Sequence, residues 1–266
     1  MEVLLIYLAL FGTVLLLKLL LKYVYAYLLK KKKKEFEQQH DYYYRIVSEN
    51  LRYFNRLSAG VQQKFLFRTY LFHHQKKFHY VGVQARPEMP VLISAVAVQL
   101  TMGLERFSLD FFKDIYVLQH DYHYGYYSLP FMGHVDSTGI YLSWANFYQG
   151  IRNSNDVSNV GMHEMAHALT YVNFISKTEE DRHFSHEFRN FSKVARPIFQ
   201  SMQKGQKNLL GDYAATNYHE FWAVSVETFF GNPARFQHQL PELYAAMAKL
   251  LNQDPVAQLK SQFATG

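Results

Sequence analysis

Two histidines and a glutamate are spaced so that their side chains could bind a metal ion and use it in catalysis. His163 and His167 are four residues apart and Glu164 follows His163, which gives the pattern HExxH. If the segment is helical, both imidazoles lie on one face and can bind one ion. Glu164 lies about 100° further round the helix axis, where it can reach a metal-bound water without replacing a ligand. The pattern predicts a zinc site in which Glu164 accepts a proton from that water.

The alternative is a core helix that carries two histidines on its surface. The residues around the motif are small or apolar, as expected of a helix buried beside a cleft, and they favour the metal site. These neighbours are Val160, Gly161, Met162, Ala166, Ala168 and Leu169.

A catalytic zinc usually has three protein ligands, and HExxH supplies two. Glu220 and Glu227 lie seven residues apart in a predicted helix at 218–230, close to one face. That helix is so apolar that it must be buried, and buried carboxylates need charged partners such as zinc and its imidazoles. Alternatively, Glu220 completes a capping box with Asn217, and Glu227 pairs with a lysine.

His183 and His186 are further candidates for the third ligand. Their neighbours are mostly charged, which favours an exposed loop or helix start instead. The chain has 13 histidines and no cysteine, so disulfides, thiol catalysis and cysteine-based zinc sites are excluded.

The N-terminal segment is typical of a membrane anchor. Residues 3–29 are apolar apart from Lys18 and Lys22, and Lys30–Lys34 follow. Those two internal lysines lie near one end of the segment and can reach the headgroups. A signal peptide would have positive charge before the apolar run, where Glu2 stands, and a helix lying on the membrane would need a polar face. We expect an anchor at 1–29, a basic juxtamembrane and helical linker at 30–58, and a catalytic domain at 59–266.

The charge distribution indicates the orientation and the partners. Without the seven lysines at 18, 22 and 30–34, the formal net charge of +6 becomes −1. The basic surplus therefore belongs to the anchor, which favours a membrane and argues against nucleic acid. The positive-inside rule places the catalytic domain in the cytoplasm, in a single-pass protein of the inner or plasma membrane.

Hydrophobic periodicity predicts an α+β fold, with mostly helices around a small mixed sheet. Hydrophobic residues make up 49% of the chain and charged residues 19%, as in folded domains. Helices are expected at 35–80 with a turn at 58–60, from 156 to a break at 204–208, at 218–230 and at 241–251. By periodicity the apolar run at 91–100 is a buried helix or a strand, and its length and alanines favour a helix. Strands are expected at 114–118 and 140–144, with 122–127 as a strand or a loop.

Several of these stretches together resemble the Mlc titration factor A family of zinc peptidases. They are HExxH, Tyr213–Asn217, Glu220–Val224, Glu227–Phe230, Leu142–Trp144, Val91–Ile93, Pro241–Tyr244 and Asp254-Pro255. The resemblance covers about 59–255. It departs from the family at 168–170, where Lys-Leu-Asp is frequent, and at 217–218, where Asp-Pro is frequent. Because of these departures, no regulatory partner is carried over.

The resemblance implies a gluzincin-like catalytic fold and a role for each residue. One Zn²⁺ would be held by His163, His167 and Glu220, with Glu164 as the general base. The hydroxyl of Tyr213 would stabilise the tetrahedral intermediate, and Glu227 would orient a ligand imidazole. The strand at 140–144 would be the edge strand that carries an extended peptide, with Ser143 and Trp144 in contact with the substrate.

The expected reaction is hydrolysis of peptide bonds in a peptide or protein substrate. The alternative is a membrane-tethered protein that keeps zinc for structure and sequesters a regulator. Glu164 argues against that alternative, because a structural zinc site has no use for a base.

Overall fold

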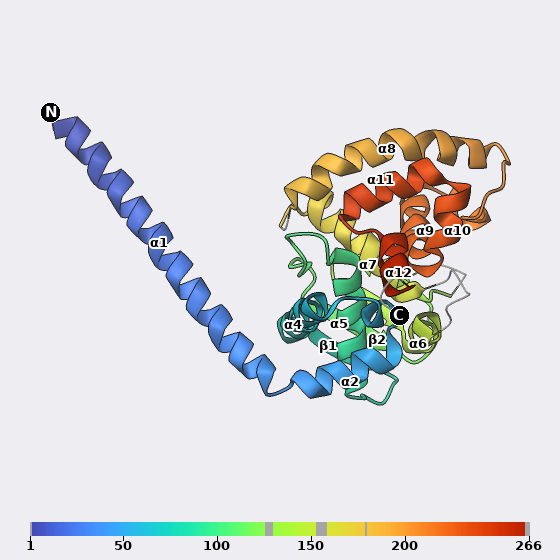
Figure 1. The fold of residues 1–266 in the computed structure, drawn as a ribbon, viewed down its shortest axis with the longest axis horizontal. Coiled ribbons are helices and arrows are strands. Elements are labelled where there is room, and N and C mark those ends of the chain that lie inside the picture. The colour runs from blue at the N-terminus through green and yellow to red at the C-terminus, as the bar shows by residue number, and fades with distance from the viewer. Residues whose placement is uncertain (1, 126–129, 153–158, 179, 264–266) are drawn as a thin grey trace. The chain divides into compact units, whose positions relative to one another are not determined.

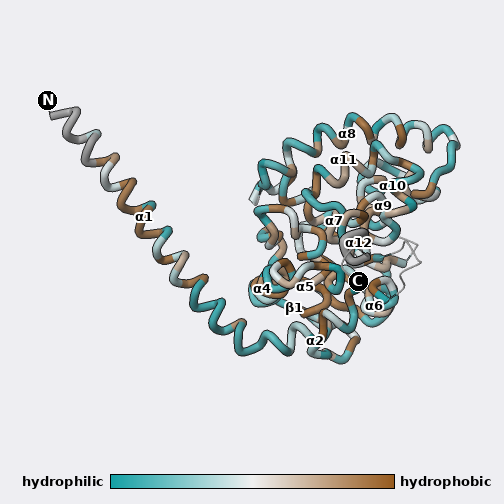
Figure 2. The backbone as a smooth tube through the Cα atoms, in the orientation of Figure 1, coloured by the Kyte–Doolittle hydropathy of each residue, from teal (hydrophilic) through white to brown (hydrophobic). Residues whose placement is uncertain are grey.

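A computed structural model describes residues 2–125, 130–152, 159–178 and 180–263 (Figure 1). The chain forms two compact units, residues 1–42 and 43–266. The first consists mainly of α1 (Glu2–Glu37). Within α1, Leu10–Glu37 is long and apolar enough to cross a membrane, a property that signal sequences share. Figure 2 shows hydrophobic residues along much of α1 and a hydrophilic stretch at its C-terminal end.

The second unit is an α+β domain, as expected, in which helices surround one small sheet. A π-helical segment (Tyr171–Ile175) continues α7, and a 3₁₀ turn (Asp212–Ala215) precedes α9. The elements that follow α1 are α2 (His40–Asn50), α3 (Arg52–Asn55), α4 (Ala59–Gln75), β1 (Lys77–Val81), α5 (Glu88–Thr101), β2 (Asp114–Leu118), β3 (Gly133–Asp136), β4 (Gly139–Ser143), α6 (Trp144–Arg152), α7 (Val160–Thr170), α8 (Arg182–Gln203), α9 (Tyr218–Gly231), α10 (Pro233–Gln239), α11 (Pro241–Leu251) and α12 (Pro255–Phe263).

The sheet has the strand order β1-β2-β4-β3. β1, β2 and β4 are parallel, and β3 runs antiparallel to β4. β4 is therefore paired on both sides, and the prediction that 140–144 forms the edge strand was wrong. Among the described residues the two edges are β1 and β3, and the edge beside β4 is β3, a strand of only four residues that contains Gly133 and Asp136. Glycine and aspartate are poor strand formers, so the sequence pattern did not reveal it.

The inner face of the sheet packs against helices. Its buried side chains are Ile115 and Val117 of β2 and Ile140 and Leu142 of β4. α5 is buried from Met89 to Thr101, which explains its long apolar run. α7 packs against α5, β3 and β4, so the helix that carries HExxH lies directly beside the sheet edge.

The outer face carries a row of stacked rings that crosses all four strands. His79, Tyr116, Tyr141 and His134 follow one another in register, with centroid separations of 4.7, 4.4 and 4.2 Å. Neighbouring rings are within 18° of parallel. Such cross-strand pairs stabilise a sheet, and this row ties the short edge strand β3 to the other three.

The prediction of helix as far as residue 80 was wrong at its end, because β1 begins at Lys77. β1 contains Phe78, Tyr80 and Val81, which suit a strand, and its pairing with β2 decides the outcome. Tyr122 forms an isolated bridge with Phe131, whereas 126–129 lie outside the described residues. The core of the second unit also takes in Tyr43, Val47 and Phe54, which lie upstream of residue 59.

Candidate metal centre and active-site cleft

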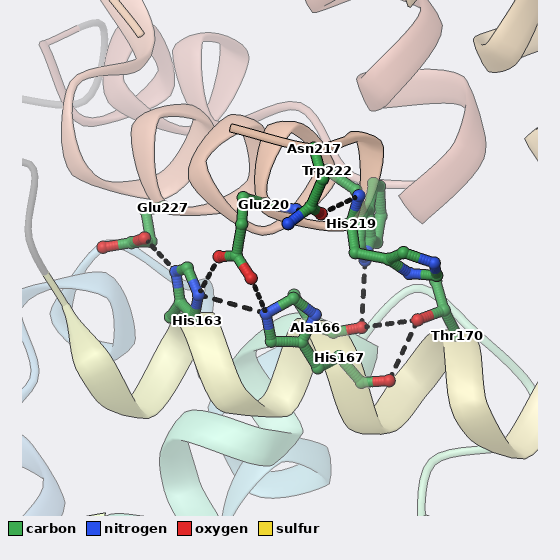
Figure 3. Close-up of polar contacts among 9 residues, drawn as sticks. All are labelled: His163, Ala166, His167, Thr170, Asn217, His219, Glu220, Trp222 and Glu227. Atoms are coloured by element: carbon green, nitrogen blue, oxygen red, sulfur yellow. Dashed lines mark hydrogen bonds and ion pairs between the residues drawn. The ribbon is translucent and has the colours of Figure 1, made fainter. Parts of the chain in front are cut away.

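α7 presents the two motif histidines on one face. Asn159 begins the helix, and its side-chain oxygen accepts a hydrogen bond from the Met162 amide at 3.0 Å. The rings of His163 and His167 lie one turn apart, with centroids 4.7 Å from each other. Both point toward α9 (Figure 3).

α9 is fixed against α7 by a buried polar contact. The indole nitrogen of Trp222 donates to the carbonyl of Ala166 at 2.9 Å. The side chain of Asn217 caps α9 by accepting hydrogen bonds from the amides of His219 and Glu220. The Glu220 side chain does not turn back to the cap and instead reaches across to the histidines of α7 (Figure 3).

Three side chains converge to within the reach of one ion. The Nε2 atom of His163 lies 2.9 Å from Glu220 Oε2 and 3.1 Å from His167 Nε2. His167 Nε2 lies 3.6 Å from Glu220 Oε1. One ligand atom from each residue lies within 4.8 Å of the others. The shortest separations are close to the edge of about 3.3 Å of a tetrahedron with metal–ligand bonds of about 2.0 Å.

Glu227 holds His163 from the other side of the ring. Its Oε1 atom lies 2.6 Å from His163 Nδ1, and its Oε2 atom accepts a hydrogen bond from the Asn159 amide at 2.7 Å. A carboxylate in this position assigns the proton to Nδ1 and leaves the lone pair on Nε2. That lone pair faces an imidazole nitrogen and a carboxylate, so the group needs a positive charge at its centre. A bound metal cation supplies that charge, and the residues present therefore fit a metal.

The same contacts shift the pKa values of His163 and Glu220. Burial alone would lower the pKa of His163, but the hydrogen bonds and charges of Glu220 and Glu227 raise the pKa to about 10. Burial alone would raise the pKa of Glu220, but His163 and His167 hold the pKa far below its ordinary value. Both shifts come from the mutual attraction of the carboxylates and the imidazoles.

Glu164 lies beside this group and is almost completely buried, with 4% of its surface exposed. Its Oε2 atom has no hydrogen-bond partner among the described residues. Burial raises the pKa of Glu164 to about 8, the carboxylates of Glu220 and Glu227 add to the rise, and His163 opposes it. A carboxylate whose pKa lies near neutrality and that has a free oxygen is suited to accept and return a proton.

Gly133 of the edge strand brings the sheet up against Glu164. A Cβ atom at this position would lie 2.7 Å from Glu164 Cγ and 2.8 Å from Glu164 Oε1. Only a glycine allows the backbone of β3 to approach so closely. The Glu164 side chain and the β3 edge of the sheet are therefore direct neighbours.

A cleft of about 470 Å³ opens over these residues. Tyr213 lies on its wall, 59% exposed, with its ring 6.0 Å from the ring of His163. Burial of the hydroxyl and the charge of nearby Glu220 raise the pKa of Tyr213, so its phenol stays protonated at neutral pH. Other walls are formed by β3 (Gly133, His134, Val135), by the π-helical segment (Tyr171, Phe174, Ile175) and by α8 (Phe188, Ser192, Arg196).

Ser143 and Trp144, which were predicted to bind substrate, do not line this cleft. Ser143 is fully buried, and its hydroxyl contacts the Asn146 amide group. Trp144 begins α6, is 3% exposed and stacks on Phe147. They were assigned to the substrate because 140–144 was taken for the edge strand, and β3 covers that side instead.

His183 and His186 lie outside the site. His183 contacts the carbonyl of Lys249, and His186 contacts Glu187. Neither belongs to the metal-binding group found among the described residues.

Sequence reasoning missed the cleft walls contributed by β3 and α8. β3 gives a weak strand signal. On α8 the signal was available, because Phe188, Ser192 and Arg196 follow one another at four-residue spacing on one helix face.

An α+β domain with a buried HExxH helix, a converging glutamate and a cleft at a free sheet edge is the architecture of a metallopeptidase. Residues 27–251 match the family described as glucose-regulated metallo-peptidase M90, and the chain belongs to this family. This is the Mlc titration factor A family that the sequence resembles, and the match begins upstream of residue 59. An uncharacterized protein of Synechocystis is 24% identical over 232 residues, which cover 79% of this chain and 83% of the relative.

Proposed function

We propose that this protein is a zinc-dependent peptidase whose site is formed by His163, His167 and Glu220, with Glu164 as the general base. The convergence of those three side chains beside a buried carboxylate with a free oxygen carries the proposal. Two imidazoles and one carboxylate are the ligand set of many catalytic zinc sites, and family membership supplies the metallopeptidase class. When bound, zinc polarises the substrate carbonyl and lowers the pKa of a coordinated water.

Three residues of the chain have separate roles in the reaction. Glu164 takes the proton from the attacking water and passes it to the leaving amine, for which a pKa near neutrality is suited. Tyr213, protonated and close to Glu220, donates a hydrogen bond to the developing oxyanion. Glu227 keeps His163 in the tautomer that directs Nε2 into the site.

The free edge of β3 supports binding of an extended peptide. Its partner β4 takes one side of β3, and the other side borders the cleft at Gly133 and Val135. A peptide that adds to this edge would lie beside Glu164, because Gly133 touches that side chain.

The test is zinc content followed by cleavage of a mixed peptide library. We expect the wild type to bind one zinc and to cleave peptides, and Glu164→Gln to keep zinc but lose nearly all hydrolysis. Glu242→Gln, an exposed acid in the first turn of α11, is the matched control. Equal hydrolysis by wild type and Glu164→Gln would refute the mechanism. Zinc without cleavage in either protein would favour a binding protein that sequesters a regulator.

We further propose that α1 is a single uncleaved anchor in the inner or plasma membrane, with the catalytic domain in the cytoplasm. The apolar length of Leu10–Glu37 and the lysines at 30–34 support this orientation. A reporter active only in the cytoplasm, fused after Gly266, should be active, and the membrane-bound protein should keep its full mass. Activity of an exported reporter instead would reverse the orientation.

A further inference from the structure

One face of α8 lines the cleft and is apolar at one end and positively charged at the other. Phe188, Ser192 and Arg196 all line the cleft, at successive intervals of four residues. At 1.5 Å per residue, Phe188 and Arg196 lie about 12 Å apart along the helix. This wall therefore offers an apolar ring at one end and a cation at the other.

The apolar end is completed by the π-helical segment that follows the HExxH helix. Phe174 packs on Phe188 with ring centroids 4.9 Å apart. Phe174 is 39% exposed and its neighbour Ile175 is 63% exposed, although both line a concave site. Exposed apolar surface inside a cleft is suited to an apolar side chain of a ligand.

The cationic end consists of Arg196 held on an aromatic ring. The guanidinium carbon lies 5.2 Å from the centroid of the Tyr218 ring. Arg196 forms no ion pair with an acidic side chain of the described residues, and it is the one lysine or arginine among the described cleft residues. An arginine stacked in this way is pre-organised to bind a carboxylate through two N–H groups.

A buried hydroxyl next to Arg196 is only loosely held. The Tyr218 hydroxyl is buried and makes no hydrogen bond of normal geometry within the described part of the chain. Ser192, whose hydroxyl lies beside it, lines the cleft between Phe188 and Arg196. The contact between these two hydroxyls leaves the Tyr218 hydroxyl short of a hydrogen bond of normal geometry, so a ligand oxygen at this position would be favoured.

We propose that the cleft binds a peptide carboxylate at Arg196 and Tyr218 and an apolar residue of the same peptide at Phe188 and Phe174. An extended peptide advances about 3.3 Å per residue, so the two groups are three to four residues apart in the substrate. The carboxylate is an acidic side chain or the free C-terminus. This inference deepens the proposed function, because it assumes that the cleft binds peptides.

The experiment measures binding of three fluorescent, N-acetylated peptides that share one leucine. The first is amidated and has no acid, the second is amidated with a glutamate four residues from the leucine, and the third is the first with a free C-terminal carboxylate at that distance. The full-length protein is used as zinc-loaded Glu164→Gln, so that bound peptide is not consumed. Dissociation constants are measured by fluorescence anisotropy, and kcat/KM is measured in parallel on the protein with Glu164 intact.

We expect at least one carboxylate peptide to bind about tenfold more tightly than the neutral one. Arg196→Gln should remove this advantage, and Arg196→Lys should keep part of it. Arg189→Gln, an exposed arginine of α8 outside the cleft lining, should leave it unchanged. The second and third peptides distinguish an acidic side chain from a free C-terminus.

Equal binding of all three peptides, no binding of any, or the same loss in Arg189→Gln and Arg196→Gln would overturn the carboxylate site. The outcome for the peptidase function is separate. If the carboxylate preference appears but the intact protein cleaves nothing, the peptidase proposal fails and the binding site stands. If peptides are cleaved without any preference for a carboxylate, the peptidase proposal stands and this inference fails.

Discussion

Glu227→Gln separates the residue that would bind the metal from the one that holds its ligand. Glutamine keeps the size of the side chain but has one acceptor oxygen where glutamate has two. In the structure both oxygens are used, at 2.6 Å from His163 Nδ1 and 2.7 Å from the Asn159 amide. The variant can therefore serve one donor only, and its amide group faces the other.

The magnitude follows from those contacts. A hydrogen bond to a charged group contributes about 1.5–3 kcal/mol, and Glu227→Gln removes one and weakens the second. A loss on this scale corresponds to about 10–100-fold in metal affinity, the usual cost of losing a partner of a ligand imidazole. We expect Glu227→Gln to retain zinc with weakened affinity and reduced hydrolysis. Glu220→Gln should lose zinc on mild dialysis, because only His163 and His167 would remain as protein ligands.

The assay is metal content after dialysis, together with zinc affinity from competition with a coloured chelator. Glu242→Gln serves again as the control, since this acid is exposed on α11. If Glu227→Gln is free of metal and Glu220→Gln keeps it, the roles of the two glutamates are reversed. If both variants keep full zinc, the third ligand lies outside α9.

Three further predictions concern the remaining parts of the domain. Tyr213→Phe should lower kcat per bound zinc by about 10²-fold, the cost of one oxyanion donor, and unchanged turnover would assign Tyr213 to structure. Gly133→Ala should displace the Glu164 side chain, which a Cβ would approach to 2.7 Å, and reduce kcat by about 10²-fold with zinc retained. Gly60→Ala, with no atom within 4 Å of the added carbon, is its control. Burial lowers the pKa of His73 from its ordinary 6.5 to about 4. Between pH 4 and 6.5, His73 is therefore protonated in the unfolded chain but not in the folded protein. The free energy of unfolding therefore has its full value above pH 6.5 and decreases by about 2–3 kcal/mol as the pH falls to 4. In unfolding measured over a pH series, His73→Gln should flatten this decrease. An unchanged decrease would assign it to another group.

The sequence determined those features that depend on neighbours along one helix. The four-residue spacing of His163 and His167 places both imidazoles on one face of any helix, whatever packs against it. The unbroken apolar run at 91–100 similarly predicted the buried helix α5. The motifs spread from 91 to 255 were enough to indicate the family. These signals are local, and the packing of the domain reinforced them.

The pairing of separate elements was decided only by the tertiary structure. Glu220 and Glu227 share a helix face, and no spacing rule says which imidazole atom each carboxylate meets. The structure directs Glu220 to Nε2 and Glu227 to Nδ1 of the same ring, because α9 crosses α7 at the contact between Trp222 and Ala166. The strand order likewise gave the free edge to β3 rather than to β4, since hydrogen bonding between strands depends on partners distant in the chain.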